Sequence, residues 1–497
     1  MIDNNLAKIG EKKQSVTSSI LWLAIAEIFF NFSGYIIHAF LGRMLGPADY
    51  GRYGLVVTLT TMIIMLIGNG IPTAMSKYIS GFFENQPGLV LSVKKKAALL
   101  QFVLIGIITI IFFLLAPVLS FILRDPTLTP LFRISSLIIP SFAAASFYLY
   151  YYIGIHRFSL QSTLKIVRSF ARIIFVVGLA YFFGLKGSIS GYILAPATVF
   201  LTAYLIDKFF INRHFPKDNK NFFDWKKLVN YAWPVTLFMI FYELLISLDL
   251  YLVKGVLAND HLTGIYNASL TVGRIPYYLF YALTLVMLPS ISRTTSQNNL
   301  TETKRIMSQT FRLMLMILIP IIILMIAYAE PLIQLFFGSR YADSVLPMQI
   351  LAPGVGFLTI FYVLSFALNG AGKVKIPMYI ALFGMILNAI LNYILILKFG
   401  ISGSAIATSL VSGLITVIIL FYALRYFGKF IQIKSVAKII FAGILMFFVS
   451  IFFPPQEWLF ILWSAILTGI YLFILIILKE FTLDDFNFFR KIIFKKK

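Results

Sequence analysis

The chain has 497 residues, of which 60% are hydrophobic and 12% charged, and its mean hydropathy is +0.90. These values exclude an ordinary soluble domain and predict a polytopic membrane protein, because apolar runs long enough to cross about 30 Å of hydrocarbon alternate with short polar links. The net charge of +23 does not indicate a nucleic-acid partner, since the basic residues are spread over many short turns, and the lack of cysteine excludes disulfides and thiolate metal sites.

In chain order, the apolar segments predict fourteen transmembrane helices in an all-α protein. The first is expected to be an uncleaved span, because it is too long for a signal peptide and lacks a small-residue cleavage site. The tenth is expected to be broken near Gly338. The predicted spans are 17–45, 50–80, 95–122, 128–156, 159–183, 187–212, 225–256, 261–292, 303–328, 330–370, 374–397, 401–424, 433–454 and 457–479.

Lysine and arginine predict the orientation of these spans. If the N-terminus is inside, 30 of the 42 basic residues fall on inner tails and turns, 8 on outer ends and 4 deep within spans. A bias of this size indicates that both termini are cytoplasmic. We therefore expect a multi-pass protein of the cytoplasmic (inner) cell membrane.

A repeat divides the chain into two related halves. "GLKGS" (184–188) and "GISGS" (400–404) are 216 residues apart, and other matched residues keep this offset. "YGRY" (50–53) matches "TGIY" (263–266) at an offset of 213. Each half holds six spans, an even number, which predicts two pseudo-symmetric six-helix lobes related by an axis along the membrane normal.

The repeat predicts four segments of the chain. The N-lobe holds spans one to six and the C-lobe spans seven to twelve, and the long polar connector 212–227 lies at the boundary between them. Two extra C-terminal helices and a basic cytoplasmic tail follow. The predicted segments are 1–216, 217–430, 431–480 and 481–497.

The fifth span carries a polar stripe. Gln161, Lys165, Arg168, Ser169 and Arg172 fall within about 80° of arc on an otherwise apolar helix. Cations facing lipid cost roughly 2.5–3.5 kcal/mol each at the helix centre, so we expect the stripe to face a wet cavity or a partner, and its residues are candidates for substrate binding. For Lys165 the alternative is snorkelling to the cytoplasmic interface.

The eighth span carries a second polar stripe. Asn267, Thr271, Arg274, Tyr278 and Tyr281 recur at intervals of four and three residues, which places Arg274 near mid-membrane. Arg274 and Tyr278 are therefore also candidate substrate-binding residues. A structural salt bridge is the alternative interpretation for Arg274.

Three carboxylates within predicted spans are candidates for coupling sites or counter-charges, namely Glu27, Glu243 and Asp249. They either neutralise the arginines or couple transport to H+ or Na+. At the first outer turn, Arg43 and Arg52 are the candidates for an outer gate.

No sequence motif indicates an enzyme. There is no GxxxxGK[ST] or HExxH motif and no long outer loop, so we expect no catalytic residue, no metal and no cofactor. The energy source stays open between H+ or Na+ coupling and the membrane potential.

Several segments resemble a known family. They are "LGRMLGPADYGRYGLV", "LPSISR", "LNGAGKVKIPMY" and "LNAILNYILILKFGISGSAIATSLVSGLI". Over essentially the whole chain, they are similar to the polysaccharide biosynthesis family of flippases, which includes the Wzx-type O-antigen flippases. This family lies within the MOP exporter superfamily, together with MurJ and the MATE exporters.

The resemblance implies two lobes around a central cavity that opens alternately to each side and moves a lipid-linked oligosaccharide outward. It also implies a functional role for Arg274 and a lipid-binding groove formed by the two C-terminal helices. Glu27 and His38 depart from the MurJ pattern, which has arginines in the first span, so the resemblance does not point to lipid II as substrate.

We therefore expect a flippase for a polyprenyl-(pyro)phosphate-linked oligosaccharide, serving cell-surface polysaccharide synthesis. The alternatives are a MATE-type exporter of cationic drugs, which a lumen rich in arginine disfavours, and a membrane polymerase or ligase. Expected partners are the substrate and membrane lipids, and not nucleic acid. Glycan polymerases or glycosyltransferases of the same pathway are further candidate partners, and we expect a monomer.

Overall fold

The computed structural model describes residues 16–68, 70–83, 86–215, 225–297, 299–453 and 458–481. Within these ranges the chain is helical and contains no strand, so the predicted all-α class is confirmed. Apart from Phe481, the predicted basic tail lies outside the described residues.

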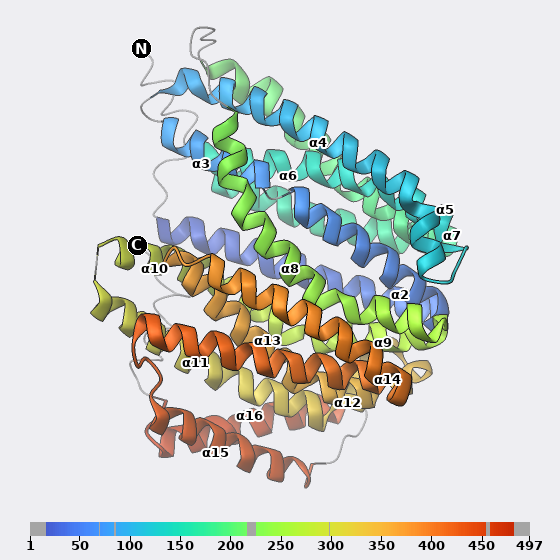
Figure 1. Cartoon of the computed structure of the whole chain (residues 1–497), viewed down its shortest axis with the longest axis vertical. Helices are drawn as coiled ribbons and strands as arrows, with labels where there is room; N and C mark the ends of the chain where they lie inside the picture. The colour runs from blue at the N-terminus through green and yellow to red at the C-terminus, as the bar shows by residue number, and fades with distance from the viewer. Residues whose placement is uncertain are drawn as a thin grey trace. The chain divides into compact units, whose positions relative to one another are not determined.

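Figure 1 shows the helices in chain order. The first half contains α2 (Val16–Gly68), α3 (Gly70–Phe82), α4 (Pro87–Ile122), α5 (Leu128–Ser136), α6 (Ile138–Gly154) and α7 (Phe158–Ile206), followed by a π-helix (Asp207–Ile211) and a 3-10 helix (Asn212–His214). The second half contains α8 (Lys226–Leu257), α9 (Asp260–Gly273), α10 (Ile275–Ser296), α11 (Leu300–Ala327), α12 (Ala329–Phe337), a 3-10 helix (Ser339–Ser344), α13 (Val345–Gly370), α14 (Lys375–Phe427), α15 (Ile433–Ser450) and α16 (Leu459–Ile477).

Among the described residues, nine helical segments are long and apolar enough to cross a membrane, which confirms a multi-pass protein. Three of the longest helices each contain two helices joined at a non-helical glycine: Gly46 in α2, Gly184 in α7 and Gly400 in α14. These glycines lie between spans that the sequence predicts as separate. The total of fourteen spans stays a prediction.

The turns at Gly184 and Gly400 have the same conformation. Their φ and ψ angles are 57° and −137° for Gly184, and 59° and −139° for Gly400, values that only glycine adopts readily. Three residues later, a Cβ atom on Gly187 or on Gly403 would lie 2.0 Å from the carbonyl oxygen of Leu179 or Leu395, respectively. The turn is therefore repeated in backbone geometry as well as in sequence, as the offset of 216 requires.

Besides the tenth predicted span, in which α12 ends before Gly338 as expected, two predicted spans are each divided into two helices. The fourth consists of α5 and α6, which meet at Leu137, and the eighth consists of α9 and α10, which meet at Arg274. Pro140 and Pro276 follow these breaks by two or three residues. Proline lacks a backbone N–H and clashes with the carbonyl four residues earlier, which accounts for both interruptions.

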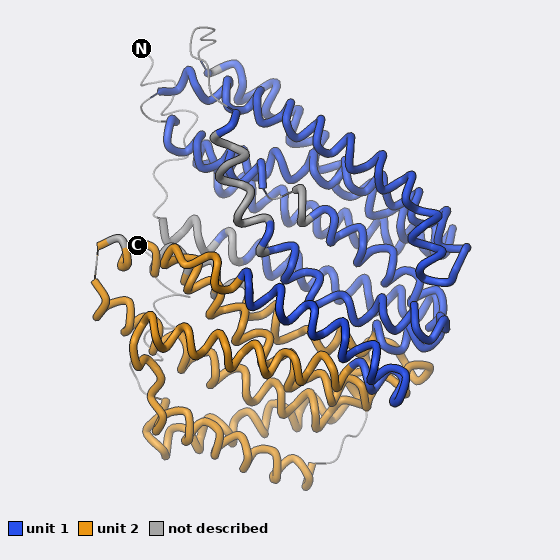
Figure 2. The backbone as a smooth tube through the Cα atoms, viewed as in Figure 1, with its two compact units in different colours: residues 1–267, 378–404 blue, residues 268–377, 405–497 orange. Residues whose placement is uncertain are grey.

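Figure 2 divides the chain into two compact units. Unit 1 comprises residues 1–267 and 378–404, and unit 2 comprises residues 268–377 and 405–497. In unit 1, α7 packs against α2 and α6; in unit 2, α10 packs against α13 and α11 packs against α15. The predicted segment boundaries, after residues 216, 430 and 480, stay predictions.

Candidate functional site

The cations of the fifth span lie on α7 in unit 1 and contact the first half of α2. The Lys165 ammonium forms an ion pair with the Glu27 carboxylate. The Arg172 guanidinium donates hydrogen bonds of 2.5 Å to the carbonyl oxygen of Phe30 and of 2.5 Å to the hydroxyl of Ser33. The stripe therefore faces protein, as the cost of placing cations in lipid requires.

All three cations surround one aromatic ring. Lys165, Arg168 and Arg172 lie 5.4, 5.1 and 4.1 Å from the centroid of Phe30. The Arg168 guanidinium also lies 3.9 Å from the centroid of Phe142 on α6, which places it against two rings. Cations are attracted to the faces of such rings. We call Phe30, Phe142, Lys165, Arg168 and Arg172 the Phe30 cluster.

Among the residues that the structure describes, Arg168 has no anionic partner. The residue is 6% exposed, and within the described parts of the chain its guanidinium forms no hydrogen bond or ion pair. The nearby carboxylate, Glu27, is paired with Lys165. A buried cation without a counter-charge is unusual, since burial disfavours the charged form. The Phe30 cluster thus carries three cations and contacts one carboxylate, which suits an anionic ligand.

The aromatic members of the cluster and the residues that accommodate Arg172 were not predicted from the sequence. Gly34 is one of these, because a Cβ atom there would lie 3.4 Å from Nη2 of Arg172. Gln161, which the stripe includes, is 6% exposed and accepts a hydrogen bond from Ser162. Phenylalanine in an apolar helix carries no polar signal, so Phe30 and Phe142 could not be singled out.

The other predicted substrate-binding residues belong to unit 2. Arg274 is half-buried at the junction of α9 and α10. Tyr278 is 38% exposed, and its ring meets that of Tyr277 edge to face at 5.2 Å. Tyr277 in turn lies 5.0 Å from Tyr362 on α13. Arg274 and Tyr278 thus lie one helical turn apart, and Tyr278 belongs to a row of three contacting tyrosine rings.

The two acids of the seventh span lie on α8 in unit 1. Glu243 is half-buried, whereas Asp249 is fully buried. One Asp249 oxygen accepts a hydrogen bond of 3.0 Å from the Tyr266 hydroxyl, and the other accepts one of 2.8 Å from the backbone N–H of Leu250. These bonds stabilise a carboxyl group in the core of unit 1.

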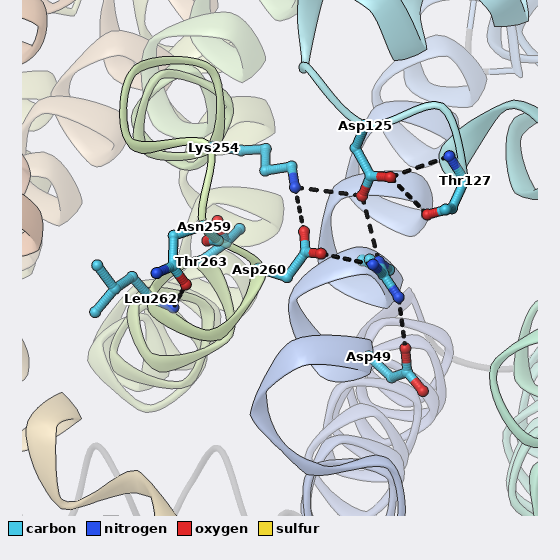
Figure 3. Close-up of polar contacts among 9 residues, drawn as sticks. Asp49, Asp125, Thr127, Lys254, Asn259, Asp260, Leu262 and Thr263 are labelled. Carbon is cyan, nitrogen blue, oxygen red and sulfur yellow. Dashed lines mark hydrogen bonds and ion pairs between the residues drawn. The ribbon is translucent and has the colours of Figure 1, made fainter.

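Arg52, an outer-gate candidate, lies in a cluster of five charged side chains from four segments of unit 1 (Figure 3). Its guanidinium pairs with Asp260 at 2.7 Å, with Asp49 at 3.2 Å and with Asp125 at 3.3 Å. Lys254 pairs with Asp125 at 3.2 Å and also with Asp260. We call these residues the Arg52 cluster. It joins α2, the loop after α4, α8 and the start of α9.

The other candidate, Arg43, is an exposed residue of α2. Neither Lys254 nor the three acids of the cluster were predicted as site residues from the sequence. The sequence does place all of them at predicted outer ends of spans. These ends come from distant parts of the chain, so the sequence does not show that they meet.

Beside the Arg52 cluster, two helices contact each other through their backbones. A Cβ atom on Gly51 of α2 would lie 2.7 Å from the backbone nitrogen of Gly264 on α9. A Cβ atom on Gly264 would lie 1.8 Å from the carbonyl oxygen of Pro47. Only glycine allows this approach. The two glycines are the matched residues of "YGRY" and "TGIY", so the contact joins equivalent positions of the repeat.

The Asp125 carboxyl lies between α4 and α5, outside the membrane-spanning helices. Burial raises its pKa, but hydrogen bonds from Thr127 and the charge of Lys254 lower it by more, so the pKa lies below the ordinary value of 3.8. A carboxyl whose pKa is lowered in the folded state stabilises that state above its ordinary pKa. The contribution is lost as the pH falls through the folded-state pKa.

The Arg52 cluster is therefore expected to hold α2 and α9 together across pH 5–8 and to separate only below about pH 4. Spin labels on Ala48→Cys and His261→Cys report the distance, because both positions are exposed and the natural chain has no cysteine. A distance change with its midpoint between pH 5 and 7 would contradict the assignment to Asp125.

Comparisons with known proteins agree with this architecture. The family model described as polysaccharide biosynthesis protein matches residues 16–295, and the MatE model matches residues 229–394. An uncharacterised membrane protein of Methanocaldococcus jannaschii is 24% identical over 435 residues, which cover 83% of this chain and 98% of the relative. A probable low-salt glycan biosynthesis flippase of Haloferax volcanii is 24% identical over 205 residues, covering 39% of this chain and 43% of that protein.

A solved structure of the lipid II flippase MurJ, in an inward closed conformation, superposes with a TM-score of 0.71 at 19% identity. The match covers 92% of this chain and 98% of that structure. The fold thus defines a multi-pass membrane protein with the architecture of MurJ and of the MATE transporters. Within that class, the chain belongs to the polysaccharide biosynthesis protein family, whose model spans more than half of it.

Proposed function

We propose that the protein is a flippase that moves a polyprenyl-(pyro)phosphate-linked oligosaccharide from the inner to the outer leaflet by alternating access, for the synthesis of cell-surface polysaccharide. The observation that carries the proposal is Arg168, a buried guanidinium with no anionic partner in the described residues. Arg172 lies in the same cluster. Two arginines around one ring match the clustered oxygens of a phosphate or pyrophosphate group.

Buried arginines would lower the free-energy barrier that a phosphate group meets when it crosses the membrane. A phosphate or pyrophosphate group that leaves water loses its hydration, and guanidinium groups replace it with bidentate, charge-assisted hydrogen bonds. An inside-negative membrane potential also favours outward movement of negative charge by about 2.3 kcal/mol per charge per 100 mV. The proposed transport therefore requires no coupled ion, and Glu27 serves as the counter-charge of Lys165.

The names of two related proteins support the substrate class. The Haloferax volcanii relative is described as a probable glycan biosynthesis flippase, and the structural neighbour MurJ as a lipid II flippase. One name refers to glycan biosynthesis and the other to a lipid, and the proposed lipid-linked oligosaccharide combines the two. At sequence identities of 24% and 19%, these names do not identify which glycan this chain would carry.

In the proposed cycle, the Arg52 cluster and the glycine contact beside it form the outer gate. Five side chains with formal charges of both signs hold α2, α8 and α9 together at the ends predicted to be outer. In this proposal, separation of α2, α8 and α9 opens the outer end of the protein. The opposite charges make the closed state stable enough to persist and still reversible, because ion pairs exchange readily for water.

A second candidate is the export of cationic drugs, which the match of residues 229–394 to the MatE model favours. The excess positive charge of the Phe30 cluster opposes it, because like charges repel a cationic substrate. Reconstituted vesicles distinguish the two functions. We expect a fluorescent polyprenyl-pyrophosphate oligosaccharide to become accessible in the opposite leaflet at a rate that depends on the protein, and ethidium not to be transported.

The measurement follows the loss of fluorescence to a membrane-impermeant reductant, with protein-free vesicles as the baseline. An imposed voltage, positive on the receiving side, is expected to accelerate flipping. Ethidium transport without flipping of the lipid-linked sugar would contradict the proposal and favour the drug exporter.

A further inference from the structure

Two adjacent pockets in unit 2 form a groove at the start of α11 and α15. Their volumes are about 460 and 530 Å³, and both are lined by Gln432, whose side-chain amide donates a hydrogen bond of 3.3 Å to Ser308. We call the two pockets together the Gln432 groove. The first is lined by Ile431, Gln432, Ile433, Lys434, Ser435, Lys438 and Glu480, and the second by Thr301, Lys304, Arg305, Ser308, Gln309, Lys429, Phe430 and Gln432.

The groove has an excess of positive charge. Lys304, Lys429 and Lys434 are exposed, and none of them forms an ion pair with any residue that the structure describes. Arg305 is not counted with these three lysines, because it already pairs with Glu302 at 2.7 Å. Three ammonium groups therefore remain to bind an anion from outside the protein.

A buried acid, Glu480, lines the first pocket. Glu480 is 5% exposed, accepts a hydrogen bond from Ser435, and lies 3.6 Å from Arg312 and 3.7 Å from Lys438. These contacts join the segment after α16 to the first turns of α15 and to the middle of α11. The shape of the groove is therefore built by the fold and does not depend on mobile side chains alone.

An apolar surface continues from the groove along α15. Ile433, at the first position of the helix, is 80% exposed, and Ile440, Phe441 and Ile444 are exposed further along. In the second pocket, Phe430 is buried and packs edge to face on Phe311 at 5.7 Å. A basic pocket that leads onto an apolar helix face matches a molecule with an anionic head and hydrocarbon tails.

We propose that the Gln432 groove binds the headgroup phosphate of an anionic phospholipid of the surrounding bilayer, with the acyl chains against α15. This site differs from the Phe30 cluster in unit 1, and the bound lipid is a resident of the protein surface and not its cargo. A free inorganic phosphate would match the lysines but would leave the exposed apolar side chains of α15 without a partner. Burial of acyl chains there adds a favourable term that only a lipid supplies.

Native mass spectrometry of the full-length protein in detergent, titrated with dioleoylphosphatidylglycerol, tests the proposal. Each lysine near an anionic lipid contributes about a fivefold change in affinity, so the triple variant Lys304→Gln, Lys429→Gln, Lys434→Gln is expected to bind roughly 100-fold more weakly. The corresponding triple lysine-to-arginine variant keeps the charge and is expected to bind within about threefold of the natural protein.

The matched control variant carries Lys186→Gln, Arg340→Gln and Lys398→Gln. It changes the net charge by the same amount, but at the predicted outer ends, so its lipid affinity should equal that of the natural protein. Equal weakening in both glutamine variants, or equal binding of dioleoylphosphatidylcholine, would overturn the proposal. So would displacement of the lipid by inorganic phosphate at similar concentration, which would identify a phosphate site. Tighter binding of undecaprenyl phosphate than of phosphatidylglycerol would assign the groove to the transported lipid instead.

If the glutamine variant does not fold, the natural protein still gives the answer. Raising ionic strength screens exposed charges, so phosphatidylglycerol affinity should fall between about 0.05 and 0.5 M salt, while phosphatidylcholine retention should not. Salt-independent binding of both lipids would contradict a site built on lysine charges. Flipping by the protein in neutral vesicles is measured separately, so this result is independent of the proposed function.

Discussion

Arg168→Gln is expected to lower the rate of flipping about 30- to 150-fold without lowering the stability of the protein. The loss corresponds to one charge-assisted interaction of about 2–3 kcal/mol with the phosphate group at the barrier. The side chain has no ion-pair partner among the described residues, so its removal leaves no orphaned carboxylate behind. The free energy of unfolding should therefore stay the same or rise.

Flipping is measured with the fluorescent lipid-linked oligosaccharide in vesicles, and unfolding by denaturant titration in detergent. Lys165→Gln is the matched control on the same face of α7. It leaves Glu27 unpaired, so stability should fall, whereas flipping should decrease less than in Arg168→Gln. A loss of stability in Arg168→Gln with normal flipping per folded molecule would show that the guanidinium is structural.

Gly264→Ala is expected to destabilise the closed arrangement of α2 and α9 by about 1–3 kcal/mol. The added methyl group would lie 1.8 Å from the Pro47 carbonyl oxygen, a backbone atom that cannot move aside without separating the helices. In the proposed cycle, the Arg52 cluster would then spend more time apart. Accessibility of a cysteine at position 48 to a membrane-impermeant thiol reagent, added from outside, should rise.

Gly273→Ala is the control, because it lies on the same helix and its Cβ atom would meet Leu351 at an ordinary distance of 3.7 Å. Alanine has a higher helix propensity than glycine by up to about 1 kcal/mol, so this variant should be as stable as the natural protein or more stable. Equal accessibility and equal stability in the two variants would show that the glycine contact does not hold the helices together.

The sequence predicted most of what depends on local patterns. Helical periodicity placed Lys165, Arg168 and Arg172 on one face of α7, and in the structure they surround one ring. The repeat matched Gly184 with Gly400, and their dihedral angles agree. These features need only neighbouring residues or a fixed offset, which a single sequence contains.

Features that depend on partners from distant segments could not be predicted. Phe142 meets Arg168 from another helix, and nothing separates it from the other 49 phenylalanines of the chain. Asp125 and Asp260 join Arg52 only because the fold brings three chain segments together. The breaks within the fourth and eighth spans were also missed, since a hydropathy pattern does not register where backbone hydrogen bonding is interrupted.

The contact between Gly51 and Gly264 has one more consequence. Equivalent positions of two repeats can touch only on the axis that relates them, as identical surfaces do in an isologous dimer. Each half of the chain thus presents the same residue to the other, and Gly51→Ala should disturb the contact as Gly264→Ala does, since its Cβ atom would lie 2.7 Å from the Gly264 nitrogen. A side chain at either position would meet the backbone at or beside the other, so the repeat imposes the same requirement for glycine on both of its matched residues.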